Sequence, residues 1–78
     1  MDKQNLLKRF GKNVKIERIK QDLTQELFAE KLNVSQNYIA NIECGKANMS
    51  LAKVLELAQC LDIPIERLLT FNDLNNNL

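Results

Sequence analysis

The stretch from Thr24 to Gly45 constrains the fold of this chain more than any other part of the sequence. It contains two short apolar-periodic runs, residues 25–32 and 36–44, and a hydroxyl residue precedes each run. A hydroxyl group at that place accepts a hydrogen bond from a backbone N–H that has no partner inside the helix. Gly45 follows the second run, and glycine adopts the left-handed conformation that ends a helix without a steric penalty. The stretch therefore predicts two short helices joined by a tight turn.

The turn between these helices has suitable residues. Asn33 lies in it, and asparagine is the best non-glycine residue for a left-handed position. Ala29 is small, as two steeply crossing helices require at their contact. Five apolar side chains on either side of the turn are spaced to share one core: Phe28, Leu32, Val34, Ile39 and Ile42.

The second predicted helix has two different faces. Ile39 and Ile42 form one edge, and steps of 100° per residue place a polar group of residues opposite or beside it. This group comprises Gln36, Asn37, Ala40, Asn41 and Cys44. A helix with a buried isoleucine edge and an outward amide edge suits recognition of a nucleic-acid groove.

The rest of the chain predicts three further helices. The first covers residues 5–20, with Asp22 as a left-handed residue after it and a buried stripe of Leu6, Leu7, Phe10 and Val14. Gly11 on this helix allows a neighbour to approach closely. Ser50 caps a helix over residues 51–61, whose apolar residues follow i, i+3, i+4, i+7 spacing. Pro64 opens a last helix over residues 65–69.

Length and composition indicate one small all-α domain. The chain has 78 residues, of which we expect 1–71 to form the domain and the asparagine-rich tail 72–78 to be frayed. Two glycines and one proline leave little material for β-turns. No apolar run approaches the roughly 20 residues that span a bilayer, and no signal-peptide pattern follows Met1. We expect a cytoplasmic protein with no membrane partner.

The net charge of +1 conceals an uneven distribution. Residues 1–20 carry seven basic and two acidic side chains, and the remainder carries four basic and eight acidic ones. An uneven field of this kind can orient a molecule on a polyanion, but a solvated helix face would give the same pattern.

The sequence offers no catalytic or metal-binding constellation. The chain has no histidine, and the spacing of Cys44 and Cys60 fits no metal site. Paired carboxylates on one face and a phosphate loop are also missing. We expect no enzyme activity, no catalytic residue, no metal and no cofactor. Reduced thiols are expected in the cytoplasm, although a redox role for Cys44 stays open because it would lie near the polar face.

The span from Phe10 to Leu69 resembles the phage-repressor and Cro type of helix-turn-helix domain, also called the XRE family. The resemblance is carried by these residues: Phe10-Gly11, Val14, Arg18, Leu23-Thr24-Gln25, Ala29, Leu32, Val34-Ser35-Gln36, Tyr38-Ile39, Ile42-Glu43, Gly45-Lys46, Ser50-Leu51, Leu57-Ala58 and Leu61-Asp62-Ile63. It implies an all-α, five-helix, lambda-repressor-like domain. The run after Lys46 is similar to small restriction–modification controller proteins, which act as dimers. Glu17 departs from the family, which usually has an apolar residue there.

The resemblance implies roles for individual residues. The helix that begins at Gln36 would enter the major groove of double-stranded DNA, where an amide can bind adenine through two hydrogen bonds. The implied base contacts are Gln36, Asn37 and Asn41, and the implied phosphate contacts are Gln25, Tyr38, Lys46 and Asn48. Tyr38 could instead flank the core without touching a ligand.

The resemblance also implies a buried ion pair and a homodimer. Arg18 and Glu43 would form the pair, with a positioning role. The homodimer would bind a two-fold symmetric operator. Its two subunits would meet through Ile65, Leu69 and Phe71. Alternatively, these side chains close the monomer's own core, as we expect of Ile63 and Leu68.

A different function remains open for the same fold. The chain could be a protein-interaction module, such as an antitoxin or anti-regulator that binds a partner protein. The apolar residues Ile16, Ile19 and Leu27 would then form the partner surface, because they lie outside the expected core.

Overall fold

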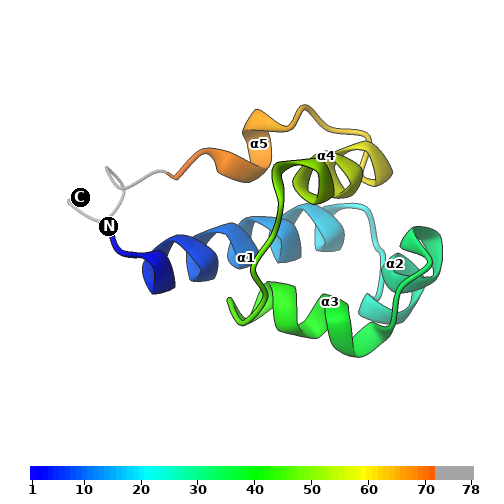
Figure 1. Ribbon diagram of the computed structural model, residues 1–78. Coiled ribbons are helices and arrows are strands. Elements are labelled where there is room, and N and C mark those ends of the chain that lie inside the picture. Colours follow the sequence, from blue (N-terminus) through cyan, green and yellow to red (C-terminus); the bar gives the residue numbers. More distant parts are fainter. Residues whose placement is uncertain (72–78) are drawn as a thin grey trace.

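The structure, a computed structural model, describes residues 1–71 (Figure 1). These residues form five helices and no strand, which confirms the all-α, five-helix prediction. The helices are α1 (Lys3–Lys20), α2 (Gln25–Leu32), α3 (Gln36–Glu43), α4 (Leu51–Cys60) and α5 (Glu66–Leu69). The predicted tail, residues 72–78, lies outside the described residues. None of the described helices is long and apolar enough to cross a membrane.

The predicted helix starts are confirmed by hydrogen bonds. The hydroxyl groups of Thr24, Ser35 and Ser50 accept from the backbone N–H three residues later, at 3.0, 3.1 and 3.1 Å. α1 begins two residues before the predicted boundary, because the Asp2 carboxylate accepts from the Asn5 N–H at 2.8 Å. Asp2 is therefore an N-cap of the same kind, with a carboxylate in place of a hydroxyl.

The first four helices end in one common motif. A left-handed residue follows each of them, namely Asp22, Asn33, Gly45 and Asp62, with φ between 55° and 78°. In each case the next N–H donates to a carbonyl five residues earlier, as Lys46 does to Asn41 at 2.8 Å. This pattern satisfies carbonyl groups at the helix end. Three of the four positions were predicted, and Asp62 was not.

The core lies between α1 and the other helices. In Figure 1, α1 crosses the middle of the molecule, with α4 and α5 on one side and α2 and α3 on the other. The buried apolar residues come from all five helices and the turn after α4: Phe10, Val14, Phe28, Ala29, Ile39, Ile42, Val54, Leu57, Ala58, Leu61 and Leu68. Leu6, predicted to be buried, is exposed, and Leu7 is half-buried. The expectation for Leu6 was wrong because the first turns of α1 extend past the end of α3.

Gly11 sets the distance between α1 and α3. A Cβ atom at this position would lie 2.3 Å from the Ile42 carbonyl oxygen and 2.7 Å from that of Glu43. Both are backbone atoms, so no side-chain rotation could relieve the contact. The close approach predicted from the sequence is therefore present, and it brings α1 against the C-terminal end of α3.

Arg18 joins α1 to α2 and α3 through a network of charged hydrogen bonds. Its Nε and Nη2 donate to the two carboxylate oxygens of Glu43 at 2.7 and 3.1 Å. Its Nη1 donates to the Leu23 carbonyl at 2.6 Å, and Gln25 Nε2 donates to Glu43 Oε1 at 3.0 Å. The Arg18 and Glu43 side chains are only 9% and 3% exposed. The ion pair that the resemblance implied is thus present, and it has two further partners.

The buried carboxylate of Glu17 is compensated within the monomer. It lies where the family usually has an apolar residue, and its oxygens are 3.4 Å from Lys20 Nζ and 3.5 Å from Arg67 Nη1. Arg67 belongs to α5, so Glu17 helps to hold α5 on α1. The Asn13 amide has the same effect, because it donates to the Leu68 and Thr70 carbonyls at 3.0 Å each.

Gly11→Ala should destabilise the fold by about 2 kcal/mol, because the overpacking of two backbone carbonyls outweighs the better helix propensity of alanine. The midpoint of urea unfolding measures this loss. Lys12→Ala, at the exposed neighbouring position, is the control and should leave the midpoint nearly unchanged. Equal midpoints for the two variants would show that α1 and α3 are not in backbone contact.

Glu43→Gln should cost about 3 kcal/mol of unfolding free energy, because it leaves a nearly buried guanidinium without its counter-charge. Glu56→Gln is the matched control: Glu56 pairs with Lys53 at 3.4 Å, but its side chain is 53% exposed. Exposed pairs contribute about 0–1 kcal/mol. Urea unfolding of both variants makes the comparison, and similar losses would contradict a clamping role for the buried pair.

Candidate nucleic-acid interface

α3 presents a polar face to solvent and an apolar face to the core. Ile39 and Ile42 are fully buried, and the exposed side chains at the start of the helix are Gln36 and Asn37. Asn41, one turn later, is half-buried, and Cys44 is the exposed C-cap residue, so α3 ends one residue before the predicted boundary. The predicted faces are therefore confirmed for the two isoleucines and for Gln36, Asn37 and Cys44, whereas Asn41 is only partly exposed. The exposed amides offer both hydrogen-bond donors and acceptors.

The N-terminus of α2 lies near the C-terminal end of α3, because Gln25 is hydrogen-bonded to Glu43. One N–H of the Gln25 amide is used in this bond, and the amide group has a second one. The helix N-terminus itself favours an anion through its free N–H groups and its dipole. The sequence did not predict that Gln25 joins the ion pair, since the two residues are 18 positions apart.

The loop after α3 carries the other two residues expected at phosphates. Lys46 and Asn48 are exposed, whereas Ala47 and Met49 between and after them pack against the core. This alternation fixes the loop to the protein and directs its polar residues to solvent. Lys46 follows Gly45, whose backbone lies directly against Lys8 of α1.

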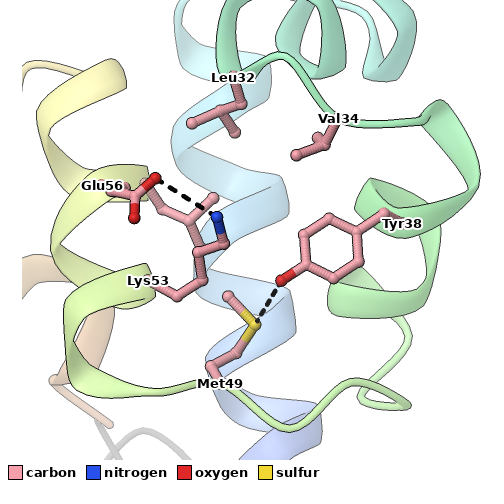
Figure 2. Close-up of a pocket in the computed structure, with 7 residues that line it drawn as sticks. Leu32, Val34, Tyr38, Met49, Lys53 and Glu56 are labelled. Atoms are coloured by element: carbon pink, nitrogen blue, oxygen red, sulfur yellow. Dashed lines mark hydrogen bonds and ion pairs between the residues drawn. The ribbon is translucent and has the colours of Figure 1, made fainter.

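Tyr38 points away from the exposed end of α3. Figure 2 shows its hydroxyl directed toward Met49, and the distance from Oη to Sδ is 3.7 Å. The ring is half-buried and packs against the core, as the alternative expectation for Tyr38 described. Thioether sulfur is a weak acceptor, so this hydrogen bond is a weak one.

The cavity beside Tyr38 is too small for a ligand. It is lined by Leu32, Val34, Tyr38, Met49, Lys53, Glu56 and Leu57 and has a volume of about 10 Å³. A volume of roughly 10–15 Å³ holds a single water molecule. This cavity therefore provides no site for an inducer or a cofactor.

The residues expected at a dimer interface differ in exposure. Leu69 is 38% exposed, whereas Ile65 and Phe71 are half-buried and pack partly against the monomer core. Leu68 is fully buried and Ile63 packs against the core. α5 and its flanks thus complete the monomer on one side and leave Leu69 on the surface.

The two cysteines are separate free thiols within the described residues. Cys60 is half-buried in α4, and burial raises the pKa of its thiol, while the charge of Lys31 lowers it by less. The thiol form is therefore favoured, and thiol is less reactive than thiolate. No group of three or more His, Cys, Asp or Glu residues in the described part of the chain is placed to hold a metal ion.

Comparison with known proteins agrees with this architecture. A family model described as helix-turn-helix matches residues 14–68. The control protein C.MunI of a Mycoplasma species is 36% identical over 67 residues, which cover 85% of this chain and 88% of that protein. The solved structure of the restriction-modification controller protein C.AhdI from Aeromonas hydrophila is 34% identical, has a TM-score of 0.75, and the match covers 80% of this chain and 94% of that one.

A more distant structure shares the fold. The hypothetical transcription factor NHTF from Neisseria is 21% identical with a TM-score of 0.83, over 99% of this chain and 88% of that one. At this identity the likeness concerns the fold alone. The family match over residues 14–68 and the similarity to the two controller proteins establish the family in addition to the fold. The chain belongs to the helix-turn-helix family of DNA-binding transcriptional regulators, to which restriction–modification controller proteins also belong.

Proposed function

We propose that this protein is a sequence-specific transcriptional regulator that binds double-stranded DNA as a homodimer, with α3 in the major groove. One observation carries the proposal: the amides of Gln36 and Asn37 are exposed at the start of a helix whose opposite edge is fully buried. The other end of α3 is held by Arg18 and Gln25 through Glu43. A helix held in this way can present its side chains to base edges in a fixed register.

Three amide side chains would contact the bases. Gln36 and Asn37 come first because groove-binding helices of this kind use their N-terminal residues. Asn41 lies one turn further along and is half-buried, so its contribution would depend on how deeply α3 enters the groove. Each good bidentate pair with adenine discriminates by roughly 1–3 kcal/mol against a wrong base.

Phosphate contacts on both sides of the groove would fix the orientation of α3. Gln25 and the N-terminus of α2 would contact one strand, and Lys46 and Asn48 after α3 would contact the other. Tyr38 could contact a phosphate only if its hydroxyl gave up its hydrogen bond to the Met49 sulfur and donated to a phosphate oxygen instead. These contacts carry no sequence information, and the lysine contact adds a salt-dependent term to the affinity.

Two copies are needed because a single domain contacts few bases. A two-fold dimer would place two α3 helices in half-sites about 34 Å apart. The surface around Leu69, with the exposed edges of Ile65 and Phe71, is the proposed interface. The similarity to two controller proteins supports a regulatory role for the assembly.

Gln36→Ala should reduce binding to the preferred duplex by roughly tenfold or more and leave binding to unrelated duplexes nearly unchanged. Lys46→Ala should weaken binding to all duplexes alike and reduce the salt slope of log K by about one unit for each subunit of the bound dimer. Fluorescence anisotropy with the preferred and a scrambled duplex measures both. A uniform loss in Gln36→Ala would remove it from the base contacts, and an unchanged slope would remove Lys46 from the phosphate contacts.

Leu69→Glu should convert a homodimer into a folded monomer, because it places a carboxylate in an interface that excludes water. Sedimentation equilibrium gives the mass, and circular dichroism checks the helix content. Leu27→Glu is the control, since Leu27 is similarly exposed at 47% but lies on α2, away from α5. A monomeric wild-type protein, or loss of the dimer in both variants, would contradict this interface.

A protein-interaction module of the same fold is the second candidate. Ile16, Ile19 and Leu27 are exposed large apolar residues, as the sequence predicted. Exposed apolar groups can mark a partner surface, although single ones are common on any protein. This candidate predicts that duplex DNA is not retained at low ionic strength.

A further inference from the structure

The N-terminal half of α1 carries a basic surface that none of the DNA contacts proposed so far uses. Gly11 marks the side of α1 that faces α3. With a rotation of 100° per residue about the helix axis, Lys15, Lys8 and Lys12 lie at about 40°, 60° and 100° from Gly11, all in the same direction. All three are exposed. We call Lys8, Lys12 and Lys15 the basic flank of α1. It lies on the side of α1 that meets α3, and it extends over about 10 Å along the helix.

The basic flank is joined to the loop that carries Lys46. A Cβ atom on Gly45 would lie 2.9 Å from the Lys8 nitrogen and Cα and 2.8 Å from its Cγ. Gly45 also has φ of +78°, a left-handed conformation that favours glycine, and its contact with the Lys8 backbone leaves no room for a Cβ atom. Figure 1 shows the chain leaving α3 beside the N-terminal half of α1 before it continues to α4. Lys8 and Lys46 therefore emerge from backbone segments in contact.

These lysines have no counter-charge within the described part of the chain. Neither Lys46 nor any lysine of the basic flank forms an ion pair with another residue of the range 1–71. α1 and α3 carry one carboxylate each, and both are paired elsewhere: Glu17 with Lys20 and Arg67, and Glu43 with Arg18. Lys8, Lys12 and Lys15 also follow each other at i+4 and i+3, where like charges destabilise a helix. An anion bound along the flank would relieve this repulsion.

We propose that the basic flank of α1 binds the phosphate backbone of the same duplex, next to the phosphates contacted by Lys46. The inference rests on the proposed function, because it places the flank beside a helix already bound in the groove. The observations that support it are the backbone contact between Lys8 and Gly45, the shared direction of the three lysines and their missing counter-charges. Several phosphates of one strand fit along 10 Å, since each strand has one phosphate per about 3.4 Å of axis. The flank would add affinity without sequence preference.

The test is a double substitution, Lys8→Gln with Lys15→Gln, in the full chain. Glutamine keeps the methylene groups through Cγ, so the packing of residue 8 against Gly45 is preserved. Anisotropy titrations with the preferred and a scrambled duplex over a range of salt concentrations give the slope of log K against log salt. The slope should fall in magnitude by about 3.6, because the bound homodimer loses four lysine contacts and each phosphate that a lysine no longer neutralises lowers it by about 0.9. The ratio of the two affinities should stay the same.

Two control variants separate position from charge. Lys31→Gln with Lys53→Gln removes the same charge from α2 and α4 and should leave the slope nearly unchanged. Lys8→Arg with Lys15→Arg keeps the charge on the flank and should retain the wild-type slope. An unchanged slope in the glutamine double variant, or an equal fall in the α2 and α4 control, would overturn the basic flank while the proposed function stands. A wild-type protein that binds no duplex would overturn both.

Discussion

The bidentate pair between Arg18 and Glu43 holds α1, α2 and α3 together at one point. It joins the end of α1 to the end of α3, and through Leu23 and Gln25 it also holds the turn and the start of α2. Each charge is almost buried, so either one alone would be costly, whereas the pair with its extra hydrogen bonds is satisfied. The start of α2 is thereby joined to the end of α3. With Ile39 and Ile42 buried on the other face of α3, Gln36 and Asn37 lie exposed to solvent.

Much of the fold follows from local signals in the sequence. A hydroxyl residue marks the start of α2, α3 and α4, and a left-handed residue ends each of the first three helices. These signals act within five residues, so they are visible without tertiary structure. Leu6 shows the limit: it belongs to the apolar period of α1, but at 40% exposure it stays outside the core. Glu17 shows another limit, because one of its two partners, Arg67, lies 50 positions later in the chain.

The candidate nucleic-acid interface, like the fold, was predictable from the sequence only where local signals determine it. Helical periodicity was enough to place Ile39 and Ile42 inside and the amides of α3 outside. The second partner of Glu43, the Met49 partner of Tyr38 and the contact of Gly45 with Lys8 were not predictable, because each depends on how separate helices pack. The uneven charge of the sequence could be interpreted only when the fold placed Lys8 against the loop after α3, with Lys12 and Lys15 on the same side of α1. Positions set by the period of a single helix were therefore easier to predict than contacts between residues of separate helices.

Selection of bound sites from random double-stranded DNA by the full chain tests the account most directly. If α3 is held rigidly and presents its amides to the major groove of each half-site, the recovered sequences should share a two-fold symmetric motif. Its half-sites should lie about one helical turn apart and contain adenines that Gln36 or Asn37 can contact. Recovery of unrelated sequences without a common motif, at a salt concentration where the protein still binds DNA, would contradict the account.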